Sequence, residues 1–358
     1  MKYYWDEKDL IEDYKLLEKI YIYEKDPERK QELSSYLELV MDKICQFAPQ
    51  HQLNYCESLE SIPYLDILLG DVASYEKYYP LIKNIDKKIY LDTSSEILVD
   101  RANPLSIDDM IELVNAFFRQ TNSEFYTLFL KNYKNRYSNI KESKINGADA
   151  MMFHIPVLDK NYIVIKRNLK KNRKLLTLLH EEGHAAAALL NPHRYLYGSI
   201  LTEVEALLFE MLGADYFGKE LDDSYFLKSQ IVNLEYYKTI AMEIIDEKLL
   251  ADLCNNDLNE ETLNNLIYKN NLSHLLYNDI PITTLYMKYL ISYLVAIELY
   301  EVYQNDKDLA LNMLKKIVMQ KKDEDDYEKI TNLVTPTSSL ESYQKRLMRK
   351  KNLLNKAK

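Results

Sequence analysis

The sequence predicts a mainly α-helical fold with one small β-sheet, and three observations lead to this expectation. The chain of 358 residues holds only six glycines and nine prolines, which is few for the many tight turns of a sheet-rich protein. Apolar residues recur at helical spacing over most of its length. They make up 47% of the chain, beside 28% charged residues, so the protein can bury a sizeable core.

The first part of the chain is expected to be helical. Residues 6–47 carry apolar side chains on one face of two successive helices, which are interrupted at Pro27. The stretch 60–140 continues with helical segments that prolines separate. Within it, Ser106 is a good N-cap for a helix whose first turn contains acidic residues, and these suit the positive end of the helix dipole.

The pattern changes after Gly147. Residues 151–158 and 162–165 are short apolar, β-branched runs separated by a polar tripeptide, and this combination predicts a β-hairpin. Beyond it, apolar spacing predicts only helices. Their expected positions are a first helix that ends near Asn191, then 199–217, 223–253, 259–270, 282–304, 307–321 and a polar helix from about 338.

The composition argues against several classes of protein. A net charge of -10 and a pI near 5.3 disfavour nucleic-acid binding as the main task. Three cysteines without a C-x-x-C pair disfavour a disulfide framework and fit a reducing cytoplasm. The N-terminus lacks the apolar stretch of a signal peptide, and no window offers about 18 uninterrupted apolar residues. We therefore expect a cytoplasmic protein that binds neither nucleic acid nor membranes.

Two basic clusters run against this acidic balance. One lies within residues 166–174, just before the helix that ends near Asn191, and the other within 345–351. Both are interpreted as solvated helix ends and not as binding patches. The first cluster is also placed where it could bring positive charge to the rim of a site.

The most informative motif is the pentapeptide His180-Glu181-Glu182-Gly183-His184, which lies in a helix-forming segment. Residues i and i+4 of a helix share one face, so His180 and His184 can both reach a single metal ion. Glu181 projects beside that ion and can take a proton from water. The motif predicts a catalytic zinc site with two histidine ligands and Glu181 as the general base.

A catalytic zinc ion needs a third protein ligand, with water in the fourth position. A third histidine six residues after the second is excluded, because Leu190 stands there. The helix expected over 199–217 offers three carboxylates instead. Glu203 and Glu210 share one face of this helix and Glu205 points elsewhere, so spacing favours Glu203 and leaves the other two open.

The motif region resembles a known family. Residues 176–185 are similar to the zinc helix of the oligopeptidase F and thimet oligopeptidase family, including the glycine inside the pentapeptide. Residues 162–165 resemble the active-site edge strand of that family, and 202–210 resemble its ligand helix. The resemblance covers roughly residues 150–300, in a chain that is shorter and more divergent than a full-length member.

The resemblance implies a helix-rich gluzincin-type metallopeptidase fold, with the small sheet beside the zinc-binding helix. It implies that Glu203 is the third ligand of one Zn²⁺ ion. It also implies that Glu210 does not bind the ion but orients one of its histidine ligands. The family also carries a histidine and tyrosines that bind the oxyanion, and residues 282–296 are the nearest match here. That histidine is not recognisable, which leaves Tyr286, Tyr289 and Tyr293 as candidates and His274 as an outside one.

Among these candidates Tyr286 is favoured. One further histidine, His154, falls in a strand and is expected to be a packed residue. Three parts of the chain are expected: residues 1–140 as a helical N-terminal part that walls the cleft, 141–335 as the catalytic part, and 336–358 as a basic C-terminal helix or tail.

The expected function is zinc-dependent hydrolysis of peptide bonds, in short peptides, with Glu181 assisting the attack of water. The strand over 163–165 would hold the extended substrate by strand addition. An alternative is a catalytically weak or inactive zinc-binding relative that acts as a peptide- or protein-binding module. A helical scaffold without metal is a third possibility.

Overall fold

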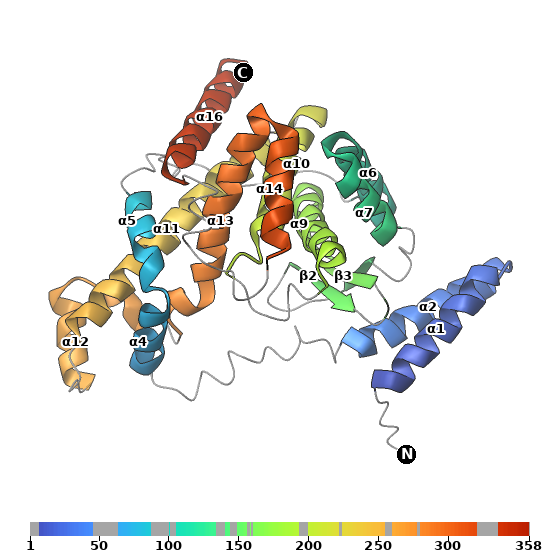
Figure 1. Cartoon of the computed structure of the whole chain (residues 1–358), viewed down its shortest axis with the longest axis horizontal. Coiled ribbons are helices and arrows are strands. Elements are labelled where there is room, and N and C mark those ends of the chain that lie inside the picture. Colours follow the sequence, from blue (N-terminus) through green and yellow to red (C-terminus); the bar gives the residue numbers. More distant parts are fainter. Residues whose placement is uncertain are drawn as a thin grey trace. The chain divides into compact units, whose positions relative to one another are not determined.

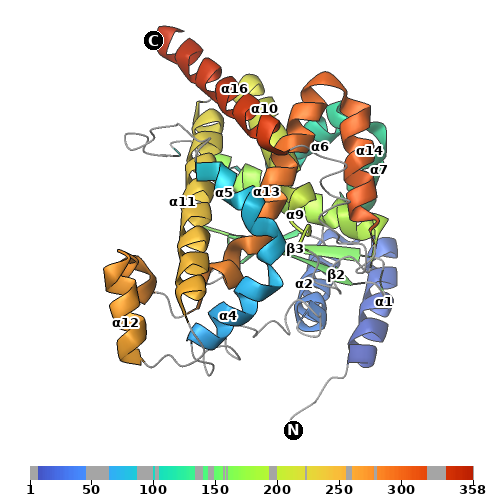
Figure 2. The same ribbon diagram turned by 60° about the vertical axis from the view of Figure 1, so that its left-hand side comes forward.

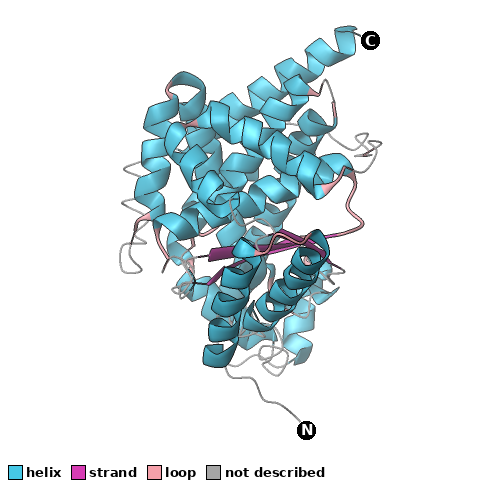
Figure 3. Cartoon of the chain, turned by 90° about the vertical axis from the view of Figure 1, so that its right-hand side faces the viewer, coloured by secondary structure: helices cyan, strands magenta, loops and turns pink. Residues whose placement is uncertain are grey.

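The computed structural model confirms a mainly helical fold with one three-stranded sheet (Figure 3). It describes residues 7–45, 64–86, 100, 105–133, 140–143, 149–155, 158, 160–192, 200–221, 224–254, 260–277, 280–320 and 336–357. The chain forms two compact units, and each is described by itself. The first consists of Met1–Leu53 and Asp100–Tyr197, and the second of Asn54–Val99 and Gly198–Lys358.

The helices of the first unit begin and end close to the positions expected from the sequence. Pro27 opens the second helix, where its missing N–H is not needed. Ser106 caps the third, since its Oγ accepts the N–H of Asp109 at 3.1 Å. The helices that the structure describes in this unit, labelled in Figure 1, are α1 (Glu7–Tyr23), α2 (Pro27–Cys45), α6 (Ile107–Thr121), α7 (Ser123–Tyr133) and α9 (Lys171–Leu190).

The sheet contains the expected hairpin and one additional strand. Strands β2 (Ala150–Ile155) and β3 (Lys160–Lys166) pair antiparallel, as predicted. Strand β1 (Ile140–Ser143) pairs parallel to β3, and the order in the sheet is β1-β3-β2. The expectation that residues 162–165 form an edge strand is therefore wrong. Strand β3 uses both of its edges within the sheet, so its backbone cannot also bind an extended peptide.

Helices α1 and α2 pack on β2 and β3 and form the core of the first unit. Partly buried polar contacts add to this packing: the hydroxyl of Tyr162 donates to Asp42 at 2.9 Å, and Lys160 forms an ion pair with Glu18. Helix α9 contacts both strands and α7. The buried residues of the cluster between these helices and strands are Leu10, Ile11, Tyr14, Leu37, Met41, Ile44, Phe153, Ile155 and Tyr162.

The second unit is helical throughout the part that the structure describes. Helix α13 contacts α4, α10, α11, α14 and α16 and so forms its centre (Figure 2). The elements are α4 (Tyr64–Ser74), η2 (Glu76–Tyr78), α5 (Tyr79–Asp86), α10 (Val204–Glu220), α11 (Tyr225–Leu253), α12 (Glu260–Lys269), η5 (Ser273–Tyr277), α13 (Ile282–Asn305), α14 (Lys307–Val318) and α16 (Pro336–Ala357).

Helix α10 departs from the expectation at both ends. It begins at Val204 and not near residue 199, because a turn occupies the residues before it. It also passes through Gly218 and ends at Glu220. A single glycine lowers helix stability by only about 1 kcal/mol, which tertiary packing easily outweighs.

Helix α13 is the one described helix that is long and apolar enough to cross a membrane by length and composition. The protein itself buries 67% of its apolar window. Its neighbours within the unit account for that burial, as expected of the core helix of a bundle.

Candidate metal centre

Helix α9, which carries the motif, is fixed at its N-terminus by a residue far away in the sequence. The Asp100 carboxylate accepts the backbone N–H groups of Asn172, at 2.7 Å, and Arg173, at 3.1 Å. A negative charge at this end of a helix satisfies unpaired donors and suits the helix dipole. The N-cap residue Lys170 supplies no such bond from its own side chain, so Asp100 replaces the usual local cap.

The basic cluster before the motif takes part in internal ion pairs. Arg173 Nε lies 2.9 Å from an Asp149 oxygen, and Lys174 pairs with Glu142 on β1. The Lys174 side chain is only 5% exposed, so the interpretation of the cluster as a solvated helix end is wrong at this position. A buried lysine needs its carboxylate partner, and these pairs join the start of α9 to the sheet.

His180 and His184 lie one turn apart on α9, as the spacing predicts. Their ring centroids are 4.9 Å apart and their planes are inclined by 84°. His184 is only 9% exposed, so nearly all of its surface is buried. Two imidazoles held at this separation by one rigid helix can approach the same ion, because the helix fixes both Cα positions before any ion arrives.

The two glutamates between the histidines are both buried. Glu182 accepts a hydrogen bond from Nδ2 of Asn132 on α7 at 2.9 Å, and its other carboxyl oxygen meets no partner within the described part of the chain. Burial raises the pKa of Glu182 to about 8, the bond from Asn132 opposes this rise, and the charge of Glu181 adds to it. Nothing in the local sequence indicated the contact with Asn132.

The sheet holds the opposite end of the motif. Asn161 on β3 donates from Nδ2 to the backbone oxygen of Ala185 at 2.8 Å, directly after His184. Its Oδ1 lies 2.7 Å from Nδ1 of His154, which is 3% exposed. His154 is thus a packed residue, as expected, and it orients the asparagine that fixes the motif helix.

In the second unit, Glu203 is the residue that precedes α10. Its φ of -103° and ψ of -3° place it at the N-cap, so it does not lie inside the helix as the sequence spacing assumed. Its backbone N–H donates to Oγ of Ser292 at 3.4 Å, and its Oε1 lies 3.7 Å from Nζ of Lys288. Glu203 is only 7% exposed. Both partners belong to α13, and sequence spacing pointed to neither.

The other two acidic residues of this segment have different surroundings. Glu205 is 1% exposed within α10. Glu210 accepts a hydrogen bond from Nδ2 of Asn233 on α11 at 3.2 Å, and its charge contributes to raising the pKa of the buried Tyr237 and Tyr293. Its expected role behind a zinc histidine stays a prediction.

The tyrosine candidates on α13 differ in exposure. Tyr293 is buried and stacks on Tyr237, with ring centroids 4.0 Å apart, which marks it as a packing residue. Tyr286 is half-buried and meets the ring of Tyr236 edge-on at 6.2 Å. The outside candidate His274 lies 3.2 Å from a carboxylate oxygen of Asp246. Of the two tyrosines, only Tyr286 lies outside the fully buried core.

His180, His184 and Glu203 each offer one ligand atom, and these atoms all lie within 4.8 Å of one another. They form the one such group of three found among the residues that the structure describes. Two imidazoles and one carboxylate are a donor set that suits zinc and leaves a coordination position open. Glu205 and Glu210, the alternatives that spacing left open, are not members of this group.

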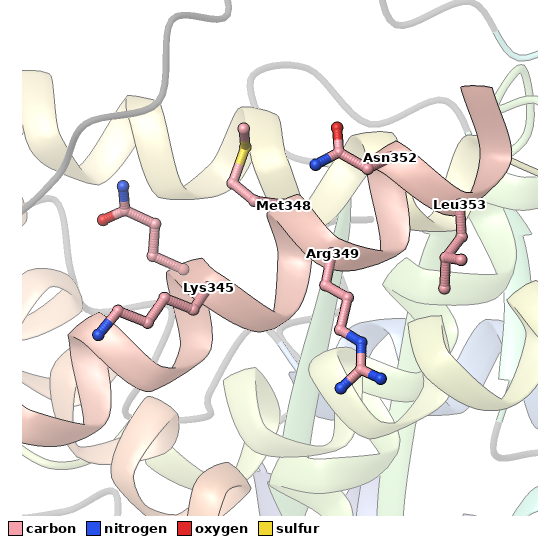
Figure 4. Close-up of a pocket in the computed structure, with 6 residues that line it drawn as sticks. Lys345, Met348, Arg349, Asn352 and Leu353 are labelled. Carbon is pink, nitrogen blue, oxygen red and sulfur yellow. The ribbon is translucent and has the colours of Figure 1, made fainter. Parts of the chain in front are cut away.

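A separate pocket of about 410 Å³ lies along α16. Met348 and Asn352 project from one side of this helix and Arg349 from the other (Figure 4). No residue that the sequence singled out for the metal centre lines this pocket, so it contributes nothing to that site. The lining residues are Gln344, Lys345, Met348, Arg349, Asn352 and Leu353.

Comparison with known proteins gives only distant structural similarity. No family model matches the sequence, and no curated protein is similar to it. A crystal structure of a candidate oligoendopeptidase F from Bacillus anthracis str. Ames is 13% identical, with a TM-score of 0.46 over 90% of this chain and 63% of the other. A 3.1 Å X-ray structure of another candidate oligoendopeptidase F is 14% identical, with a TM-score of 0.49 over 89% and 64%. The chain spans less than two thirds of either.

Proposed function

We propose that this chain is a zinc-dependent metallopeptidase that hydrolyses peptide bonds, in short peptides. One observation carries the proposal: His180, His184 and Glu203 bring their ligand atoms within 4.8 Å of one another. The residue that follows the first of them, Glu181, is a carboxylate of the kind that serves as general base in this motif. A metal site without catalytic function would have no use for this carboxylate.

The three ligands would hold one Zn²⁺ ion through two neutral imidazoles and a carboxylate, the donor set of many catalytic zinc sites. When bound, zinc polarises the scissile carbonyl group and lowers the pKa of water. Glu181, buried beside the first ligand, takes the proton of the attacking water and later gives it to the leaving amine. This transfer needs no other titratable group on α9.

Tyr286 is proposed as the donor that stabilises the oxyanion. It is only half-buried on α13, and a phenol hydroxyl can donate a hydrogen bond. Loss of one such donor lowers the rate of acyl transfer by about two to three orders of magnitude. The proposed substrate is a peptide, and an extended peptide would add to an outer strand, β1 or β2, because residues 163–165 of β3 pair on both sides. We further propose a cytoplasmic setting without nucleic-acid or membrane partners.

The test combines metal content with cleavage. The full-length chain is loaded with Zn²⁺ and desalted, bound zinc is measured by elemental analysis, and a panel of quenched fluorescent peptides is offered. About one zinc per chain together with cleavage that a chelator abolishes supports the proposal. Absence of both bound zinc and cleavage overturns it and favours a helical scaffold.

The second candidate function is a zinc-binding module that binds peptides or a protein without cutting them. One observation favours it: residues 282–296 lack the histidine that resemblance to the oligopeptidase family would place near the tyrosines. Stoichiometric zinc together with peptide binding but no cleavage would support this function.

A further inference from the structure

The structure places two side chains of α13 against the proposed third metal ligand. Lys288 and Ser292 are four residues apart, so they share one face of the helix. Lys288 lies 3.7 Å from the carboxylate of Glu203, and Ser292 accepts the backbone N–H of the same residue at 3.4 Å. One helix face therefore contacts both the side chain and the backbone of the ligand.

Ser292 fixes the turn that carries Glu203. Its hydroxyl donates to the backbone oxygen of Ile200 at 2.9 Å while it accepts from Glu203, so one oxygen joins both ends of the turn to α13. Ser292 is fully buried, so water does not compete for these bonds. The turn is thus held by a residue 89 positions later in the chain.

Lys288 acts on the carboxylate itself. The separation of 3.7 Å is too long for a hydrogen bond and corresponds to an ion pair. The Glu203 side chain is only 9% exposed, and a carboxylate this buried is unfavourable without a positive charge nearby. The lysine faces Oε1 of this carboxylate. The ammonium group also lies 4.8 Å from the ring centroid of Tyr289, a contact that restricts where it can move.

We infer that Lys288 is a positioning residue that orients the Glu203 carboxylate for metal binding. Some residues contact a metal ligand without binding the metal, and they keep the ligand in the binding orientation before the ion arrives. Their loss lowers metal affinity by about 10- to 100-fold. This inference rests on the proposed function. It assigns to Lys288 no contact with substrate.

The test measures zinc affinity by competition with a chromophoric chelator. Lys288→Met removes the charge and keeps the length of the side chain, and it should weaken zinc binding by about 10- to 100-fold. Lys288→Arg keeps the charge and should restore most of the affinity. The matched control is Lys307→Met, because Lys307 also lies over a tyrosine ring, at 5.5 Å from Tyr303, but is not paired with a candidate ligand within the described residues. This control should bind zinc like wild type.

Thermal unfolding separates positioning from simple loss of stability. Without metal, Lys288→Met leaves the buried Glu203 carboxylate without its positive partner, so the metal-free unfolding temperature of each protein is the baseline for its own comparison. With zinc, the rise in unfolding temperature should be smaller in the variant, because weaker binding stabilises the folded state less. A purely structural role would lower the unfolding temperature of the metal-free protein but leave the rise on adding zinc equal to that of wild type.

A double-mutant cycle tests whether Lys288 acts through Glu203. In a Glu203→Ala background, adding Lys288→Met should change zinc affinity no further. Unchanged affinity in the single Lys288→Met variant overturns the inference, and so does tighter binding, which would mean that the ammonium competes with the metal. The proposed function depends on the wild type alone. It stands if wild type binds zinc and cleaves peptide, whichever of these results the Lys288→Met variant gives. If wild type binds no zinc, both proposals fail together.

Discussion

Asn132 on α7 donates a hydrogen bond to Glu182 at 2.9 Å, inside the pentapeptide that carries the proposed metal ligands. Both side chains are buried, at 4% and 2% exposure. The bond joins α7 to the motif helix at the residue between Glu181 and Gly183. It therefore helps to fix the rotation of α9 about its own axis, on which the direction of both histidines depends.

Replacing Asn132 should destabilise the fold. Asn132→Ala leaves a buried carboxyl group without its donor, which costs about 1–3 kcal/mol in the free energy of unfolding. Asn132→Leu keeps the volume without the donor and should lose a similar amount, which separates the hydrogen bond from packing. Urea denaturation of the metal-free proteins measures both. A leucine variant as stable as wild type would show that volume alone matters at this position.

Glu181→Gln should keep the metal and remove the activity. The amide has nearly the same shape but cannot accept the proton of the attacking water, so the cleavage rate should fall by about 10²- to 10⁴-fold. Zinc stoichiometry, measured on the same sample, should equal that of wild type. Glu220→Gln, at the exposed end of α10, is the matched control and should cleave normally. Full activity in Glu181→Gln would remove this residue from the mechanism.

The third ligand can be identified by comparing three substitutions on one segment. Glu203→Gln should lose stoichiometric zinc, because a neutral amide is a far weaker ligand than a carboxylate. Glu205→Gln should bind zinc like wild type, and Glu210→Gln should bind it about tenfold more weakly if it supports a histidine. Elemental analysis after dialysis gives the result. Normal zinc content in Glu203→Gln, with loss of zinc in Glu205→Gln or Glu210→Gln, would identify the substituted residue of that second variant as the third ligand.

Glu247 on α11 should stabilise α13, the helix whose side chains contact Glu203. Its carboxylate accepts the backbone N–H groups of Ile282 at 2.6 Å and Thr283 at 2.8 Å, which are unpaired donors at the start of α13. The hydroxyl of Tyr64 also donates to it, at 3.3 Å. Glu247→Gln places an amide N–H₂ group against these donors, and it should destabilise the protein by about 1.5–3 kcal/mol in urea denaturation.

This penalty should depend on pH. Burial raises the pKa of Glu247 above its ordinary value of 4.5, and the hydrogen bonds that it accepts reduce that rise. An acid with a raised pKa binds more protons in the folded state, so its stabilising contribution is complete below 4.5 and falls as pH rises through the folded pKa. The penalty of Glu247→Gln should therefore be larger near about pH 5 than near about pH 7. A penalty that grows with pH would contradict a raised pKa.

Local patterns in the sequence predicted most of the helices and the placement of the two motif histidines. Helical periodicity located α1, α2, α6 and α9 because it reports a local property, the face that each helix buries. The same spacing placed His180 and His184 one turn apart on α9. These features need only neighbouring residues to be recognised.

Features that depend on distant partners were missed or misplaced. Strand β1 has only four residues, and its pairing with β3 is parallel, so no hairpin pattern reveals it. That omission led to the incorrect edge-strand interpretation. The late start of α10 depends on Ser292, and the burial of Lys174 depends on Glu142 on the same unrecognised strand. Periodicity carries no information about partners so far apart in the chain.

The position of Glu203 ahead of α10, and not inside it, has a consequence for how a metal would be loaded. The two imidazoles are arranged by the helix itself, whereas the carboxylate depends on a turn that can adjust without unwinding any helix. Zinc should therefore slow deuterium uptake at the amides of Leu201 and Val204 far more than in the middle of α9. Mass spectrometry with and without the ion would record this as a local loss of fluctuation in a protein whose architecture stays the same.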